Sequence, residues 1–182
     1  MAKMLADADI IRMLSDPNTS KKGFELLVRQ YSESLYWKVR RIVVNHEDAN
    51  DVLQNTFLKA WKGLGQFQGK SSLATWLYRI AVNEALDCLR HHRNEDDVEI
   101  DEQAMANRLL ADEYFDGDLM QAKLQSAVAM LPEVQRTVFV MKYYEDMKYS
   151  EISEVLGTSQ GALKASYHLA VKKIVELLRQ SD

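Results

Sequence analysis

Apolar residues recur at intervals of three and four along almost the whole chain, and this periodicity constrains the fold more than any other feature. One stripe runs over residues 24–42, a second over 49–64 and a third over 73–86. Only two prolines and seven glycines interrupt the 182 residues, and no segment alternates apolar and polar residues as a strand does. The sequence therefore predicts an all-α protein. Three large side chains are expected to be buried in these stripes: Trp61, Trp76 and Ile80.

Charge divides the chain into parts. Residues 94–118 hold ten acids and one arginine, a local charge of −9, whereas the remainder carries +5. Such an acidic stretch is typical of a linker between binding modules or of a solvated spacer. We therefore predict two small helical domains, residues 1–92 and 119–182, joined by an acidic linker over residues 93–118. Within the second domain, one continuous helix is predicted over residues 134–144.

Cys88 is the only cysteine, so the chain cannot form an internal disulfide, and a reducing compartment is indicated. The first residues lack the layout of a secretory signal, and no apolar run reaches the ~20 residues of a membrane helix. We expect a cytoplasmic protein without direct membrane insertion. His91 and His92 are adjacent and cannot both face one ion from a regular helix, so no metal site and no cofactor are predicted.

The C-terminal part of the chain predicts a helix–turn–helix. Ile152–Leu156 predicts the short first helix, and Gly157 supplies a residue that tolerates a left-handed turn. Leu163 falls at a buried position of the second helix. Ser150 and Ser159 are the predicted N-terminal caps of the two helices.

The outward face of this second helix is the candidate DNA-reading surface, because such a helix can enter a major groove. It carries no arginine before Arg179, so a bidentate arginine contact to guanine is not available. The alternative is two packed helices joined by a glycine turn with no DNA-binding role. The outward-facing residues are Gln160, Lys164, His168 and Lys172.

A second candidate surface lies on the helix predicted over residues 45–61. The face opposite its buried stripe carries two acids, two amides and an apolar side chain: Asp48, Asp51, Gln54, Asn55 and Leu58. An apolar anchor surrounded by charge is typical of a protein-binding surface. An ordinary solvated helix face is the alternative reading.

The third candidate surface is a polar, glycine-containing loop that precedes a helix bearing Arg79 and Asn83 on one face. A loop beside a polar helix face can form a pocket for a base taken out of its stack. Ser71 or Ser72 can cap the helix. The loop residues proposed to contact the base are Gln68, Gly69, Lys70, Ser71 and Ser72. Plain packing is the alternative for the aromatic residues of this helix.

These three constellations, in this order, resemble the extracytoplasmic-function (ECF) subgroup of bacterial RNA polymerase sigma factors, of the sigma-70 class. EDANDVLQNTFLKAW resembles region 2.2 of the family, and FQGKSSLATWLYRIAVNEALDCLR resembles regions 2.3 and 2.4. LPEVQRTVFVMKYYEDMKYSEISEVLGTSQGALKASYHLAVKKI resembles region 4. The resemblance implies a non-enzymatic factor that directs core RNA polymerase to promoters. Its implied partners are core RNA polymerase, through the β′ clamp helices and the β flap, promoter DNA, and an anti-sigma factor.

The resemblance also assigns roles to residues. The acidic face with Leu58 would dock on the β′ clamp helices. The glycine-containing loop, with Arg79 and Asn83, would capture a flipped base of the −10 element and open the duplex. The residues that would contact the −35 element are Thr158, Ser159, Gln160, Lys164 and His168.

The recognition helix departs from the family pattern. Many members carry Val-Lys-Ser-Arg there, whereas this chain reads Leu-Lys-Ala-Ser over residues 163–166. Because this arginine is missing, the −35 sequence preference of those members is not carried over to this chain. Two other classes of function stay open on the residues alone: an autonomous helix–turn–helix regulator that binds palindromic DNA as a dimer, and an enzyme that uses the carboxylates of the second helix.

Overall fold

The computed structural model describes residues 5–93 and 119–180, and its regular elements within these ranges are all helical. The chain forms two compact units, Met1–His92 and Arg93–Asp182. Most of the predicted linker, residues 94–118, lies outside the described residues, so the linker stays a prediction. Among the described residues, no helix is both long and apolar enough to cross a membrane.

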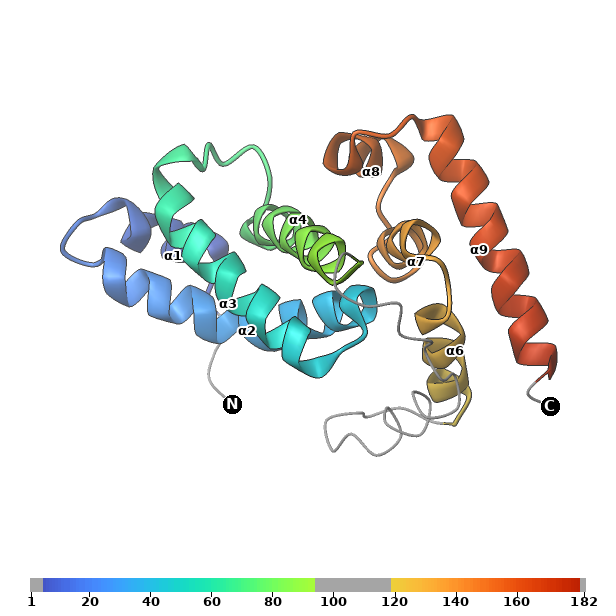
Figure 1. Ribbon diagram of the computed structural model, residues 1–182. Helices are drawn as coiled ribbons and strands as arrows, with labels where there is room; N and C mark the ends of the chain where they lie inside the picture. The colour runs from blue at the N-terminus through green and yellow to red at the C-terminus, as the bar shows by residue number, and fades with distance from the viewer. Residues whose placement is uncertain (1–4, 94–118, 181–182) are drawn as a thin grey trace. The chain divides into compact units, whose positions relative to one another are not determined.

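The N-terminal unit is a helical bundle (Figure 1). Its elements are α1 (Asp7–Ser15), α2 (Ser20–Val43), α3 (His46–Gly63), the short 3₁₀ turn η1 (Leu64–Gln66) and α4 (Leu73–Arg93). Only Val44 and Asn45 separate α2 from α3, so the two helices are neighbours. The Asn45 side chain caps α3, because its Oδ1 accepts from the backbone N–H of Glu47 at 2.7 Å.

All four helices contribute to the core of this unit, as their apolar stripes predict. Most of the long stripe residues are buried, but the sequence prediction was wrong for Trp61, which is 43% exposed. Its ring packs edge-on against Phe24 of α2 at 4.9 Å between centroids, which leaves its other side uncovered. Trp76 and Ile80 are half-buried rather than fully buried. Core side chains with zero exposure include Ile10, Leu27, Val39, Ile42, Ala60, Leu73, Leu77 and Val82.

The C-terminal unit contains five helical elements among the described residues. They are α6 (Leu119–Ala129), α7 (Glu133–Phe139), the π-helical segment η2 (Val140–Tyr144), α8 (Tyr149–Leu156) and α9 (Gln160–Gln180). The single helix predicted over residues 134–144 is therefore confirmed as a continuous helical segment, although its second half is π-helical. There the Glu145 N–H bonds the Val140 carbonyl, five residues back, at 3.3 Å. This wider turn accompanies the stacking of Tyr143 on Phe139 at 5.0 Å.

A buried arginine joins α6 and α7. Arg136 is only 6% exposed, and its Nη1 donates to the carbonyls of Ala129 and Leu131, both at 3.1 Å. Burial lowers the pKa of this guanidinium, an effect that nearby Glu133 opposes. The carbonyls at the end of α6 thus gain a charged donor in place of water.

The helix–turn–helix forms as predicted, apart from one cap. Gly157 ends α8 with φ +63° and ψ +25°, and Ser159 Oγ accepts from the Ala162 N–H at the start of α9 at 3.3 Å. Ser150, however, lies inside the first turn of α8, so the cap predicted there is wrong. The Glu151 carboxylate instead accepts from the Lys148 backbone N–H at 2.7 Å.

Candidate nucleic-acid interfaces and docking face

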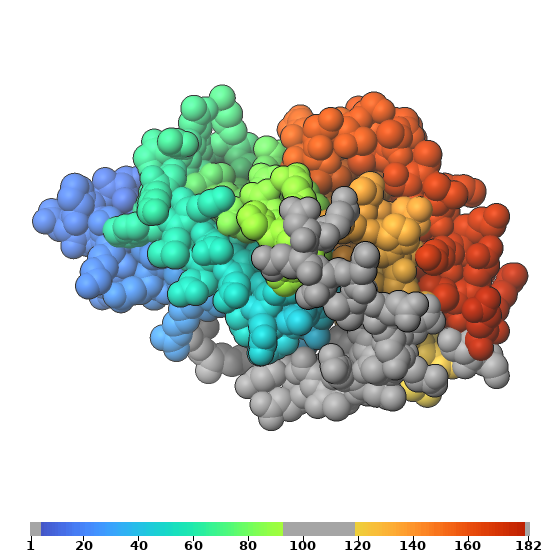
Figure 2. All heavy atoms as spheres, viewed as in Figure 1, coloured from blue at the N-terminus to red at the C-terminus, as the bar shows by residue number. Residues whose placement is uncertain are grey.

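The outer face of α3 is exposed along its length, as the space-filling view also shows (Figure 2). Asp51 and Gln54 are exposed, and Leu58 exposes 53% of its surface. Their spacing of three and four residues places them on one stripe of the helix. Trp61 extends this stripe by three further residues, so the exposed apolar surface is larger than the sequence predicted.

Asp48 does not share this orientation. Only 15% of its side chain is exposed, and its Oδ2 lies 3.5 Å from Nδ1 of His92 on α4. Burial raises the pKa of Asp48, an effect that His92 opposes and the neighbouring acids reinforce. The carboxylate is thus engaged within the bundle, whereas Asp51 points to solvent.

The loop between α3 and α4 carries the second candidate surface, and its two ends are fixed. At the first end, the Phe67 ring packs on Trp76 at 5.0 Å between centroids. Gly69 has φ +66°, a conformation that favours glycine, and has open space where a side chain would stand. Four of the five predicted loop residues are exposed and Ser71 is half-buried; the exposed four are Gln68, Gly69, Lys70 and Ser72.

The second end of the loop is held by two different acceptors. Ser72 caps α4, because its Oγ accepts from the Thr75 N–H at 3.1 Å. Asp7 of α1 reaches the same helix start, where its Oδ2 accepts from the Leu73 N–H at 3.2 Å. The other oxygen of Asp7 accepts from the Tyr31 hydroxyl. Burial and this hydrogen bond raise the pKa of Tyr31 to about 12.

Asp7 is a residue at this candidate surface that the sequence did not predict. It lies 66 residues from Leu73 along the chain, and no local pattern links the two. The acids in the first turn of α1 look like ordinary helix-dipole partners in the sequence. The contact becomes visible only when α1 is packed against the bundle.

Arg79 and Asn83 lie farther along α4, on the face that also carries Thr75. Arg79 is half-buried and Asn83 is exposed. At a rise of 1.5 Å per residue, Asn83 stands about 16 Å along the axis from Ser72. The loop and these two side chains therefore form a strip long enough for more than one nucleotide.

The first turns of α9 present the third candidate surface. Gln160, Lys164 and His168 are all exposed, as the periodicity predicted. Ser159 already uses its hydroxyl as the helix cap, and the Thr158 hydroxyl lies 3.4 Å from the Leu156 carbonyl. These two residues offer their backbone to a ligand more readily than their side chains.

An aromatic cluster fixes the direction of α9. Tyr167 stacks on Phe139 at 5.7 Å and meets Tyr149 edge-on at 6.4 Å. The Lys164 ammonium lies 5.8 Å from the centre of the Tyr149 ring, within the range of a cation–π contact. Lys164 is thus both exposed and oriented by its neighbour on α8.

Comparison with known families matches both units. The sigma-70 region 2 model matches residues 27–95, and the sigma-70 region 4 model matches residues 121–174. The chain is 30% identical over 177 residues to the RNA polymerase sigma-H factor of Pseudomonas aeruginosa, across 87% of this chain and 88% of that protein. It is 29% identical to the ECF RNA polymerase sigma-E factor of Haemophilus influenzae, across 91% of each chain.

Comparison with solved structures supports the same fold. The chain matches the sigma factor RpoE, solved in complex with the anti-sigma factor NepR from Bartonella quintana, with a TM-score of 0.67 at 23% identity. The match covers 87% of this chain and 98% of that chain.

Proposed function

The chain belongs to the sigma-70 family as an ECF-type RNA polymerase sigma factor that directs transcription initiation, and from this premise we propose which surfaces perform each step. The observation that carries the proposal is the entrance to α4. A solvent-exposed polar loop is held there by an aromatic contact at one end and by two hydrogen-bond acceptors at the other. A loop fixed before its ligand arrives loses little conformational entropy on binding.

The loop is proposed to capture an unstacked base of the −10 element, with Arg79 and Asn83 reading the strand beside it. Asn83 offers an amide that both donates and accepts, which suits a base edge. Arg79 offers a planar cation for a base or a phosphate. Unstacking costs a few kcal/mol per base step, and binding energy supplies it without covalent chemistry. The factor is accordingly proposed not to be an enzyme.

The exposed stripe of α3 is proposed to dock on the β′ clamp helices of core polymerase. Leu58 and the open side of Trp61 supply apolar contact, while Asp51 and Gln54 supply steering and hydrogen bonds. Asp48 lies in the first turn of α3, but its carboxylate faces His92, so we propose that it contributes less to docking than Asp51 does. A core of apolar side chains with polar groups at its edge is the usual composition of a protein interface.

The N-terminal turns of α9 are proposed to contact the −35 element. Thr158 and Ser159 offer backbone N–H groups at a helix start, which suits phosphate. Gln160, Lys164 and His168 face outward for base and backbone contacts. No arginine on this face reaches a guanine, so we propose weak affinity for this unit alone and dependence on the polymerase, whose β flap would hold this unit in place.

Two further features complete the proposal. The solved relative RpoE binds an anti-sigma factor, and by likeness we propose that an anti-sigma factor also regulates this chain. The cytoplasm is the proposed location, because the polymerase and its promoters are there.

The docking proposal is tested by the double substitution Asp51→Ala with Leu58→Ala. Loss of an apolar anchor and its neighbouring charge is expected to weaken binding to core polymerase about a hundredfold. Binding is measured by fluorescence titration with a label on the C-terminal unit. The control is Glu33→Ala, an exposed acid on α2 that should leave binding unchanged. Unchanged binding in the double variant would refute the docking face.

The base-capture proposal is tested by Asn83→Ala. The variant is expected to lose about tenfold of its discrimination at one −10 position, which is about 1.4 kcal/mol and within the range of about 1–3 kcal/mol for a polar base contact. The measurement is in vitro transcription with core polymerase on a library of single-base promoter variants. Asn18→Ala, an exposed amide in the α1–α2 turn, is the control. If both variants keep the wild-type preference at every position, Asn83 does not read a base.

A further inference from the structure

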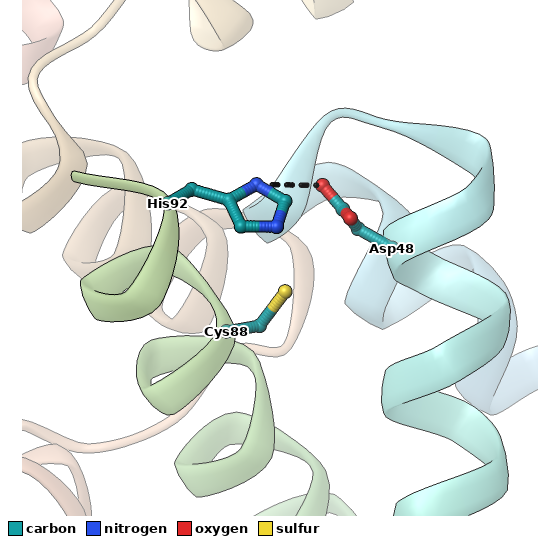
Figure 3. Close-up of side chains that lie close together, drawn as sticks. All are labelled: Asp48, Cys88 and His92. Carbon is teal, nitrogen blue, oxygen red and sulfur yellow. Dashed lines mark ion pairs between the residues drawn. The ribbon is translucent and has the colours of Figure 1, made fainter. Parts of the chain in front are cut away.

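Three side chains able to bind a metal converge where the start of α3 meets the end of α4. They are Asp48, Cys88 and His92 (Figure 3). One ligand atom from each lies within 4.8 Å of the other two. The sulfur, the imidazole and the carboxylate point into the same space between the two helices (Figure 3). None of the functions proposed above uses Cys88 or His92.

The helical spacing explains the convergence. Cys88 and His92 are four residues apart, so they lie on one face of α4, one turn apart. Asp48 comes from the first turn of α3 and faces that turn. His91 points elsewhere, because its Nδ1 lies 2.8 Å from the Asp87 carbonyl. From sequence alone, Cys88 and the two adjacent histidines make a poor metal site. The third ligand, Asp48, comes from another helix, and the local spacing does not show it.

The separations are close to those of a tetrahedral site. Zinc bonds of about 2.0 Å to nitrogen or oxygen and 2.3 Å to sulfur place ligand atoms roughly 3.3–3.5 Å apart. The Asp48 oxygen and the His92 nitrogen are already 3.5 Å apart. The remaining separations are at most 4.8 Å, which is about 1.3 Å more than the tetrahedral distance, and we expect rotation of the side chains to shorten them.

We propose that Asp48, Cys88 and His92 bind one Zn²⁺ ion, with water as the fourth ligand. One sulfur, one nitrogen and one oxygen ligand suit a borderline-soft cation better than Mg²⁺ or Ca²⁺, which take oxygen ligands. His92 is exposed and the other two residues are half-buried, so an ion can enter from solvent on the His92 side. The thiol proton leaves to solvent when the Zn–S bond forms.

Zinc at this position would join the first turn of α3 to the last turns of α4. The ion should bind the folded unit more tightly than the unfolded chain, and it would then stabilise the bundle according to its free concentration. It would also neutralise Asp48 beside the proposed docking stripe. The zinc proposal can still be tested separately from the docking proposal, because metal binding is measured on the chain without polymerase.

The test uses Co²⁺ as a spectroscopic probe on the purified full chain. We expect one Co²⁺ per chain and a thiolate-to-cobalt charge-transfer band, which Zn²⁺ displaces. Cys88→Ser should abolish the band. Asp48→Asn and His92→Ala should each weaken Zn²⁺ binding at least about tenfold in competition with a chelating dye. His91→Ala is the matched control and should bind as the wild type does.

Thermal unfolding gives an independent measurement. Trp37, Trp61 and Trp76, the three tryptophans of the chain, all lie in the N-terminal unit, so their fluorescence reports the unfolding of that unit. Added Zn²⁺ should raise its midpoint in the wild type and in His91→Ala, and not in Cys88→Ser. Three results would each overturn the proposal: no charge-transfer band, unchanged zinc affinity in both Asp48→Asn and His92→Ala, or an equal loss in His91→Ala.

Discussion

The two long helices α4 and α9 start in the same way and are held differently. Each has 21 residues, and each follows a glycine with positive φ and a serine that caps its first turn. At the start of α9, the hydrogen bonds of the described residues come from nearby in sequence, since the Gly157 N–H bonds the Ser153 carbonyl at 2.9 Å and Ser159 caps the helix. At α4, Asp7 adds an acceptor from 66 residues away.

This difference corresponds to the different tasks proposed for the two helices. A recognition helix needs a stable start and an outward face. Local capping supplies the start, and the contacts of Tyr167 with Phe139 and Tyr149 orient the face. A loop that captures a base must keep its shape against the strand that it opens, and contacts from several elements restrict its movement. Contacts from several elements of the N-terminal unit therefore hold the start of α4, whereas about ten neighbouring residues supply the capping contacts at the start of α9.

Removing Asp7 should have the largest effect, because Asp7 is the contact that distinguishes the start of α4 from the start of α9. Asp7→Ala deletes the acceptor for both the Leu73 N–H and the Tyr31 hydroxyl, and hydrogen bonds to a charged group are worth about 1.5–3 kcal/mol. We expect the free energy of unfolding of the N-terminal unit to fall by about 2 kcal/mol. Urea unfolding followed by tryptophan fluorescence measures it.

Two controls accompany this prediction. Asp9→Ala removes an exposed acid of the same helix whose only ion pair, among the described residues, is a 3.9 Å contact to Arg12, and should cost less than about 0.5 kcal/mol. Ser159→Ala removes the local cap of α9 and should leave the tryptophan transition unchanged. Equal transitions for Asp7→Ala and Asp9→Ala would show that the long-range contact does not stabilise the unit.

Two glycines at the start of α9, Gly157 and Gly161, should give smaller effects when they are substituted. Gly157→Ala forces a left-handed conformation on a residue with a Cβ and should destabilise the C-terminal unit by about 1 kcal/mol. Gly161→Ala, four residues later inside α9 and in open space, should stabilise it by about 0.5–1 kcal/mol. Thermal unfolding followed by far-ultraviolet circular dichroism measures these two stability changes, which are expected to have opposite signs. The same sign for both would contradict the assigned backbone conformation.

The comparison also shows what the sequence could predict. The helix class, Gly157, the caps at Ser72 and Ser159, and the exposure of Lys164 follow from local spacing and local chemistry. Residues close in sequence make these contacts, so a pattern of a few residues contains them. Family motifs added the functional class, which periodicity alone does not provide.

Contacts between distant segments could not be predicted. Asp7 with Leu73 and Asp48 with Cys88 are pairs of residues 66 and 40 positions apart in the chain. Trp61 follows the apolar spacing and is still 43% exposed, although its ring packs edge-on against Phe24. Spacing predicts which face of a helix turns inward, but it does not give the extent of the element that covers it.

The smallest expected effect concerns pH and the second partner of Asp7. The pKa of Tyr31 is raised to about 12, so the folded unit favours the neutral phenol relative to the unfolded chain. Its contribution is therefore complete below about pH 10, where an unfolded tyrosine is still neutral, and is lost as the pH rises through about 12. Tyr31→Phe lacks this group, so the stability advantage of the wild type should shrink between pH 9 and pH 11. Urea unfolding of both proteins by tryptophan fluorescence measures the difference. A constant advantage over this range would show that Tyr31 ionises equally in the folded and unfolded chains, and that Asp7 stabilises the start of α4 without it.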